Sequence, residues 1–481
     1  MKLSNLIPGA SPDITITGLT ADSREVRAGY LFAALPGNKE DGDKYIDDAI
    51  AHGAAAILAR PGTPCRDGVV MITDEQVRQS FARACAAFYQ LQPAHVAAVT
   101  GTSGKTSVVS FTQQLWHLSG ITSCASLGTL GLRGPGMIRA GSLTTPSSEK
   151  LMAELADLSS AGITHLAMEA SSHGLDQYRL DGVRLQVVAF TNLSRDHLDY
   201  HPTMDDYFNA KTRLFTELLM TGGTAVIAVD DEYGQRLARL CAERKIKTIT
   251  VGYKGKDIQI LTRTSSPHGQ RIEIAVQGRK IPVTLPLVGE FQVMNVLTAL
   301  GILMAGGADP LKMVPYMEQL RGVAGRLQLV PGHPHRAAVY VDYAHKPAAL
   351  QSVLQTLRPH TTGKLFCVIG CGGDRDPGKR AMMGKIASDL ADITVITDDN
   401  PRTEDPAKIR SAMLSGVTQP GKAKEIPSRQ DAIIWSVGQI KAGDVLVIAG
   451  KGHEQGQTIG EKVFPFDDVT EAKKAMENLN V

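Results

Sequence analysis

The segment Thr100-Gly101-Thr102-Ser103-Gly104-Lys105-Thr106-Ser107 carries the clearest chemistry in the chain. Its glycines allow a tight turn whose backbone N–H groups face an anion, and a following helix adds the positive end of its dipole. Lys105 can bridge terminal phosphates, and the Thr106 hydroxyl can bind Mg²⁺. The full Walker spacing is absent because Val99 stands where that motif has its first glycine. An ordinary glycine turn is the plain alternative, but Gly-Lys-Thr between a strand and a helix favours a nucleotide site.

A lysine interrupts an apolar stripe further along the chain. Residues 203–219 are typical of a helix, with Thr203 as the N-cap residue. Lys211 falls three residues after Phe208 and four before Phe215, so helical spacing places it on their stripe. A buried, unpaired ammonium is costly and would need a partner or a chemical modification. Spacing alone favours the simpler alternative, in which the side chain reaches the solvated edge of the stripe.

Two further polar groups follow predicted strands. Glu169 ends one strand, and His197 lies in the polar stretch that follows the next. Taken singly, a glutamate or a histidine is more often a surface group. Because ligands of open α/β sheets gather at the carboxyl ends of strands, Lys105, Glu169, His197 and Lys211 can converge on one crevice. Their joint placement predicts a site for Mg²⁺ and ATP.

The 481 residues predict about three domains. We place them at 1–92, 93–324 and 325–481, since strand–turn–helix alternation begins after Pro93 and begins again near 325. Alternating apolar residues at about 255–288 predict an antiparallel patch on a parallel sheet. The fold class is therefore α/β. The main predicted strands are 14–19, 29–34, 54–59, 69–72, 95–99, 165–169, 187–191, 224–229, 248–251, 338–342, 365–369, 393–396 and 445–448, and the main predicted helices are 77–89, 203–219 and 293–304.

Composition excludes several classes of protein. Hydrophobic residues make up 43% and charged residues 21%, as in ordinary globular proteins. A net charge of +2 gives no basic surface for nucleic acid. The six cysteines form no Cys-x-x-Cys pair, which argues against a zinc site or a disulfide framework. We expect a cytoplasmic protein, because the N-terminus lacks an apolar signal core and no apolar stretch is long enough for a membrane span.

Taken in order, several segments resemble the Mur ligase family along essentially the whole chain. They are the phosphate loop, Glu169–Leu175 (EASSHGL), Asn192–His201, Tyr207–Lys211 (YFNAK), Gly325-Arg326 and Val341–His345 (VDYAH). The resemblance implies three domains: an N-terminal α/β uridine-binding domain, a central P-loop ATPase-like domain and a C-terminal Rossmann-like domain.

The resemblance also implies roles for these residues. Lys211 would be carbamoylated by CO₂, which turns a misplaced cation into an anion that helps to position Mg²⁺. Thr106, Glu169 and His197 would complete the metal site, and Lys105 would be the fourth catalytic residue beside Lys211, Glu169 and His197. ATP would contact Gly101, Thr102, Ser103, Gly104, Lys105, Thr106, Ser107, Asn295, Arg326, Asp342 and His345.

Within the family, the chain resembles members that add meso-diaminopimelate to UDP-N-acetylmuramoyl-L-alanyl-D-glutamate. Asp399-Asn400-Pro401-Arg402 matches their signature, although Asn-Pro is also strong turn chemistry. An arginine fork suits the second carboxylate of diaminopimelate. The nucleotide substrate would contact Ala21, Ser23, Thr144, Thr145, Ser171, Gln177 and Arg179, and diaminopimelate would contact Arg375, Asp399, Asn400, Pro401, Arg402, Gly450 and Glu454.

The implied reaction is ATP-dependent amide formation in peptidoglycan synthesis, by a monomer that acts on small molecules. The D-glutamate γ-carboxylate would take the γ-phosphoryl group of ATP, and the diaminopimelate amine would then attack the acyl phosphate. A lysine-adding sibling is an alternative against which Arg402 argues, and the uridine-type segment 21–32 argues against a folylpolyglutamate synthetase. A nucleotide-dependent switch without ligase activity would leave Lys211 and residues 399–402 unexplained. A dinucleotide-binding enzyme is disfavoured, because no G-x-G-x-x-G opens either α/β region.

Overall fold

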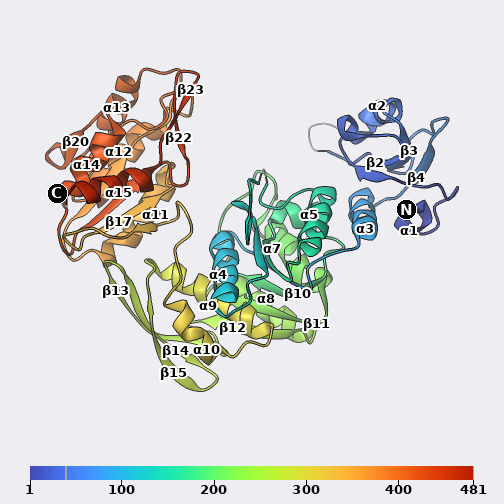
Figure 1. The fold of residues 1–481 in the computed structure, drawn as a ribbon, viewed down its shortest axis with the longest axis horizontal. Helices are drawn as coiled ribbons and strands as arrows, with labels where there is room; N and C mark the ends of the chain where they lie inside the picture. The colour runs from blue at the N-terminus through green and yellow to red at the C-terminus, as the bar shows by residue number, and fades with distance from the viewer. Residues whose placement is uncertain (38–40, 142, 480–481) are drawn as a thin grey trace. The chain divides into compact units, whose positions relative to one another are not determined.

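A computed structural model describes residues 1–37, 41–141 and 143–479. The chain divides into two compact units, Met1–Gln259 with Met294–Met313, and Ile260–Val293 with Val314–Val481. Their helices and strands are drawn in Figure 1. In the described part of the chain, no helix is both long and apolar enough to cross a membrane. The predicted domain boundaries after residues 92 and 324 stay predictions.

The first unit begins with a small parallel sheet. Its strands, in spatial order, are β1 (Gly18–Thr20), β2 (Tyr30–Ala33), β3 (Ala54–Ala59) and β4 (Val70–Thr73), accompanied by α1 (Leu3–Leu6), α2 (Ile46–Ala51) and α3 (Val77–Tyr89). Successive strand residues point to opposite faces. Leu31 and Leu58 therefore join the main core of the unit, whereas Phe32 and Ile57 pack with Ile46 of α2.

A larger sheet forms the centre of this unit. Eight of its eleven described strands are β5 (His95–Thr100), β6 (Cys124–Gly128), β7 (Gly131–Gly134), β8 (Met137–Arg139), β9 (His165–Glu169), β10 (Leu185–Phe190), β11 (Leu219–Ala228) and β12 (Lys247–Gly252), and the sheet continues from β12 into an antiparallel arm. They lie in the order β12-β11-β10-β5-β9-β6-β7-β8, parallel from β12 to β6. The helices of the unit include α4 (Lys105–Leu118), α5 (Ser148–Ser160), α6 (Ser172–Asp176), α7 (Met204–Arg213) and α8 (Glu232–Glu243). Because β9 and β10 flank β5, the segments after these three strands meet at one edge, as predicted.

The helix predicted at 203–219 is partly wrong. Its start is confirmed, since Thr203 and Asp206 form a reciprocal capping box. The α-helix α7 ends at Arg213, however, and a π-helical turn, η3 (Leu214–Leu218), leads into β11. A π-turn moves each backbone hydrogen bond by one residue and leaves the order of apolar side chains unchanged. The spacing of apolar residues therefore could not reveal it.

The second unit contains an antiparallel arm and a second parallel sheet. The arm consists of β13 (Ile258–Ser266), β14 (Gly269–Val276) and β15 (Arg279–Leu285), which confirms the predicted antiparallel patch. The sheet contains β16 (Gln328–Val330), β17 (Ala338–Asp342), β18 (Leu365–Ile369), β19 (Ile393–Ile396), β20 (Ala423–Glu425) and β21 (Val445–Ala449). Its helices are α11 (Pro347–Leu357), α12 (Lys379–Leu390), α13 (Pro406–Leu414), α14 (Arg429–Gln439) and α15 (Asp468–Asn478), and its hairpin is β22 (Gly456–Ile459) with β23 (Lys462–Pro465). Helices α9 (Glu290–Ala305) and α10 (Pro310–Met317) carry the chain between the units.

The second sheet is covered by helices on both faces. Its order is β16-β17-β21-β18-β19-β20, with only the short β16 antiparallel among these described strands. Cys367 and Val447 pack with residues of α11 to α13, whereas Val368 and Ile448 pack with α14 and α15. This doubly wound arrangement confirms the Rossmann-like prediction and opens the carboxyl ends of β17, β21, β18 and β19 to ligands.

Candidate active site

The phosphate loop has a backbone that glycine makes possible. Gly104, the N-cap of α4, has φ +87°, and Gly101 has φ +147°. A Cβ atom on Gly104 would overlap Oδ1 of Asn295, and one on Gly101 would overlap the Thr191 hydroxyl. The loop is thus packed tightly at both glycines. Asn295, the predicted adenine contact, lies directly against it.

The segment after β10 fixes the loop from the neighbouring strand. Thr102 donates its N–H to the carbonyl of Asn192 at 2.9 Å, and Ser103 donates its N–H to Oδ1 of Asn192 at 3.1 Å. Thr191 donates its hydroxyl to the Ser103 carbonyl at 2.6 Å. These contacts hold the loop in shape without a ligand, as a preorganised anion site requires.

Two lysines converge on one carbonyl of this loop. Nζ of Lys105 lies 2.8 Å from the Gly101 oxygen, and Nζ of Lys211 lies 3.0 Å from the same atom. Lys211 is 1% exposed, so the expectation of a solvated side chain was wrong. Lys211 is buried because α7 packs against the phosphate loop. Helical spacing describes one helix alone, so it could not reveal this tertiary contact.

Burial lowers the pKa of Lys211 well below its usual range, and the nearby Lys105 charge lowers it further. Burial also lowers the pKa of Lys105, although Glu169 and Asp196 act in the opposite direction. Two lysine side chains that share one neutral acceptor form an electropositive cluster. A polyphosphate suits this donor set, and so does a negative charge placed on Lys211 itself.

Glu169 and Thr106 place oxygen atoms beside the two lysines. The Thr106 hydroxyl donates to Oε1 of Glu169 at 2.9 Å, and Glu169 is 2% exposed. Thr129 also donates to this carboxylate, through its N–H at 2.8 Å and its hydroxyl at 3.2 Å. Hydroxyl and carboxylate oxygens are the ligands that Mg²⁺ prefers, so these residues fit the predicted metal. Thr129 was missed because it belongs to no motif.

His197 is not joined to this pair. Its Nε2 atom lies 3.7 Å from Asp196, and its ring centre lies 5.0 Å from that of His173 and 6.0 Å from that of Tyr207. Nζ of Lys211 lies 4.5 Å from the Tyr207 ring centre, so Tyr207 has both residues as neighbours. Across the residues that the structure describes, no three His, Cys, Asp or Glu side chains are grouped for a metal ion.

The residues predicted to contact the nucleotide substrate form a network around Thr145. The Thr145 hydroxyl donates to the Glu169 carbonyl at 3.0 Å and accepts the N–H of Ser171 at 3.0 Å. Arg179 donates from Nη1 to the Thr145 carbonyl at 2.8 Å and from Nη2 to Oε1 of Gln177 at 2.6 Å. The network therefore continues directly into the Glu169 site.

Thr144 and two arginines also belong to this region. The hydroxyls of Thr144 and Thr129 lie 3.1 Å apart, which links Thr144 to the same network. Burial lowers the pKa of Arg179, and so does the nearby charge of Arg78 on α3, a residue that the sequence did not single out. Two partly desolvated arginines favour a carboxylate or phosphate ligand. Ala21 and Ser23 lie at the separate turn after β1.

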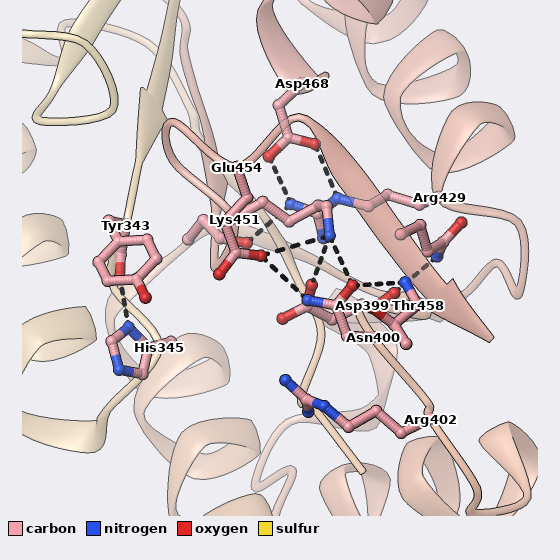
Figure 2. Close-up of polar contacts among 12 residues, drawn as sticks. Tyr343, His345, Asp399, Asn400, Arg402, Arg429, Lys451, Glu454, Thr458 and Asp468 are labelled. Atoms are coloured by element: carbon pink, nitrogen blue, oxygen red, sulfur yellow. Dashed lines mark hydrogen bonds and ion pairs between the residues drawn. The ribbon is translucent and has the colours of Figure 1, made fainter. Parts of the chain in front are cut away.

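A pocket of about 480 Å³ lies at the carboxyl edge of the second sheet. Its lining includes residues from the segments after β17, β18, β19 and β21, namely Tyr343, His345, Gly372, Arg375, Asp399, Asn400, Arg402, Gly450 and Glu454. Figure 2 shows the polar contacts of the Asp399–Arg402 loop. Nη1 of Arg402 donates to the Gly373 carbonyl at 2.8 Å. Six of the seven residues predicted to bind diaminopimelate therefore line one pocket; Pro401 does not line it.

Three further residues that were predicted to contact ATP, namely Arg326, Asp342 and His345, lie near Tyr343, which follows β17. Asp342 accepts the N–H of Leu327 at 2.7 Å, and burial raises the pKa of its carboxyl to about 6. The Arg326 guanidinium lies 5.7 Å from the Tyr343 ring centre and opposes that shift. Nδ1 of His345 lies 2.8 Å from the Tyr343 carbonyl.

Comparisons with known proteins agree with this architecture. Family models match residues 15–89 (Mur ligase family, catalytic domain), 99–303 (Mur ligase middle domain) and 325–452 (Mur ligase, glutamate ligase domain). The chain belongs to the Mur ligase family.

Similar proteins in this family share one printed name. The chain is 49% identical to the UDP-N-acetylmuramoyl-L-alanyl-D-glutamate–2,6-diaminopimelate ligase of Chelativorans sp. (strain BNC1), covering 99% of this chain and 97% of that protein. It is 47% identical to the ligase of the same name from Rhizobium meliloti, covering 99% and 98%. A solved structure of a ligase with that name matches with a TM-score of 0.80 and 34% identity, covering 100% of this chain and 99% of the other.

Proposed function

We propose that this chain is an ATP-dependent, ADP-forming ligase that adds meso-diaminopimelate to UDP-N-acetylmuramoyl-L-alanyl-D-glutamate in cytoplasmic peptidoglycan synthesis. The observation that carries the proposal is the Asp399–Arg402 loop in the pocket of the second unit. The shared name of relatives that match along the whole chain supports it. We assign residues 1–92 to the nucleotide substrate, 93–324 to ATP and 325–481 to the amino acid, and we expect a monomer.

The phosphate loop would bind the polyphosphate of ATP. Its backbone is preformed. To reach a phosphate, Lys105 would exchange its hydrogen bonds to the Gly101 and Thr102 carbonyls for hydrogen bonds to phosphate oxygens. Mg²⁺, held by Thr106 and Glu169 with His197 as a further ligand, would neutralise charge during phosphoryl transfer. Asn295 would contact the adenine, and Arg326, Asp342 and His345 would make the other contacts to ATP.

Lys211 would carry the carbamate. Only a neutral amine attacks CO₂, and the lowered pKa of this buried lysine increases the neutral fraction. Attack by Nζ on the carbon, with loss of one proton, gives an anion beside the Lys105 ammonium and removes the repulsion between the two lysines. Carbon-13 bicarbonate NMR tests this assignment: a carbamate resonance is expected in the wild type and not in Lys211→Met. Equal spectra would contradict it.

The D-glutamate carboxylate would be presented by the network around Thr145. This network joins Ser171, Gln177 and Arg179 to Glu169, so it can position the carboxylate beside the phosphate loop. Oxygen of the carboxylate attacks the γ-phosphorus, ADP leaves, and an acyl phosphate forms. The amine of diaminopimelate then attacks the acyl carbon, phosphate leaves, and the amide is complete.

The far end of diaminopimelate would lie in the pocket of the second unit. Arg402 and Arg375 would bind its second carboxylate, since a guanidinium fork matches a carboxylate. Glu454 and the Gly450 backbone would receive the ammonium. L-Lysine has no second carboxylate and would leave the arginines unpaired, which is the physical basis for expecting discrimination.

The test is the substrate dependence of ADP release. We expect release only when ATP, Mg²⁺, the UDP-muramoyl dipeptide and diaminopimelate are all present, with one ADP per tripeptide. ATP binding without turnover in the complete mixture would contradict the proposal and favour a nucleotide-dependent switch.

A further inference from the structure

Lys451 is a fully buried charge next to the amino-acid pocket. Its exposed fraction is 0%, and no role for it was predicted from the sequence. Its Nζ lies 2.9 Å from Oδ1 of Asn400, 3.3 Å from Oδ1 of Asp399 and 3.6 Å from Oε2 of Glu454. Lys451 donates hydrogen bonds to Asn400 and Asp399, and it forms an ion pair with Glu454. Figure 2 shows Lys451 at the centre of the group.

The three oxygen atoms around the Lys451 ammonium belong to two different segments. Asp399 and Asn400 follow β19, whereas Glu454 follows β21. Nδ2 of Asn400 donates to Oε2 of Glu454 at 3.0 Å, so the two segments are also linked directly. Oδ1 of Asn400 accepts from Lys451 and from the N–H of Thr458 at 2.9 Å. These bonds fix the orientation of the amide and close the group.

A buried ion pair holds the segment that carries Lys451. Arg429 and Asp468 are both fully buried and form a two-bond ion pair at 2.8 and 2.7 Å. Arg429 also donates to the Ala449 carbonyl at 3.0 Å, immediately before Gly450 and Lys451. The segment that carries Lys451 is therefore fixed at its start by a charge pair that does not face the pocket.

The charged side chains in and beside the pocket carry both signs. Lys451 faces two carboxylates, Asp399 and Glu454, so these three side chains carry one net negative charge. Arg375 and Arg402 line the same pocket. The pocket thus offers carboxylates for an ammonium and guanidinium groups for a carboxylate, which is the pattern of a zwitterionic amino-acid end. Without Lys451, two close carboxylates would repel each other and separate.

We propose that Lys451 is a positioning residue for the amino-acid substrate. Its buried ammonium holds the loop after β19 against the segment after β21, so that Glu454 and Arg402 face the ligand at a fixed separation. The inference rests on the proposed function of the pocket, and it concerns a residue that the ligand does not need to touch.

Steady-state kinetics of Lys451→Met test the proposal. We expect the KM for diaminopimelate to rise about tenfold to a hundredfold, the range for a ligand that loses one charged hydrogen bond to the displaced Glu454 or Arg402. The KM values for ATP and for the UDP-muramoyl dipeptide should stay within about twofold, because their proposed residues do not contact Lys451. Discrimination against L-lysine should fall together with diaminopimelate affinity.

Arg410→Met is the matched control. Arg410 is 8% exposed and pairs with Asp398, the residue before Asp399, and with Glu425 at 2.7 Å. Its removal also breaks a largely buried ion pair in this unit, but it does not line the pocket. We expect it to lower stability and to leave the KM for diaminopimelate unchanged.

A second variant keeps the test decisive if Lys451→Met folds poorly. Asp399→Asn with Lys451→Met removes one charge of each sign, so stability should recover, and Asp399→Asn alone completes the cycle. A KM for diaminopimelate that stays high in the stable double variant, above that of Asp399→Asn, supports positioning. A KM that returns to the Asp399→Asn value, or that rises equally for all three substrates, overturns it. If the wild type forms no tripeptide, the proposed function itself has failed.

Discussion

Replacement of Arg402 by alanine tests the amino-acid pocket most sharply. The backbone of Arg402 is held independently of its side chain, because its N–H donates to the Thr458 carbonyl at 3.1 Å and its carbonyl accepts the N–H of Gly460 at 2.7 Å. Its φ of +51° is left-handed, but alanine and arginine both carry a Cβ, so the substitution adds no new strain. The loop should therefore keep its shape.

The magnitude follows from the hydrogen bonds that the variant loses. Within the described residues, the guanidinium donates one hydrogen bond, from Nη1 to Gly373, which leaves its remaining donors for a carboxylate. Hydrogen bonds to charged groups contribute about 1.5–3 kcal/mol each. At about 1.4 kcal/mol per factor of ten, the loss of one such bond should lower kcat/KM for diaminopimelate roughly tenfold to a hundredfold, and the loss of both bonds of a fork should lower it further.

The assay is the initial rate of phosphate release against diaminopimelate concentration, with ATP and dipeptide saturating. Arg402→Lys keeps the charge without the fork and should lie between the wild type and Arg402→Ala. Arg358→Ala is the control, because Arg358 pairs with Asp392 at 2.7 Å in the same unit and does not line the pocket. A kcat/KM for Arg402→Ala within twofold of the wild type would contradict a contact between Arg402 and the second carboxylate.

Three further predictions concern buried charges. Lys105→Ala should reduce ADP formation at least about a hundredfold without unfolding the protein, as measured by ADP release and circular dichroism; near-normal turnover would contradict its role. In CO₂-free buffer, where Lys211 is unmodified, Lys211→Met should raise the free energy of unfolding of the ligand-free protein, because the lowered pKa of Lys211 means that burial opposes its charge. The gain should shrink as pH rises toward about 10.4, the pKa of unfolded lysine, and urea titrations that show a gain growing with pH would count against it. Asp342→Asn should raise stability above pH 6 by about 3 kcal/mol, because the folded pKa of about 6 exceeds the ordinary pKa of an aspartate, 3.8; no difference should remain below pH 4, and a pH-independent effect would exclude this cause.

The sequence predicted the sheets well where a strand was a short apolar run between turn signals. Residues 54–59 and 165–169 were expected at the bounds found for β3 and β9. All but one residue of each of these runs is buried, so their composition alone separates them from their surroundings. The π-turn at Leu214–Leu218 was missed because a change in hydrogen-bond register leaves no mark on composition.

The sequence predicted only those parts of the candidate site that lie in recognisable motifs. The phosphate loop and the Asp399–Arg402 loop were found because their residue types are diagnostic in sequence. Thr129 and Lys451 acquire their partners only through strand order, which brings Glu169 to the former and Asn400 to the latter. The burial of Lys211 was judged wrongly for the same reason, since its cover comes from another element.

One competition experiment shows directly which amino acid the protein adds. Enzyme, ATP, Mg²⁺ and the UDP-muramoyl dipeptide are mixed with equal meso-diaminopimelate and L-lysine, and the products are separated by mass. We predict that the diaminopimelate tripeptide is the dominant product and that its amount equals the ADP released. A dominant lysine product would contradict the role given to Arg402, and no amide product at all would contradict the ligase itself.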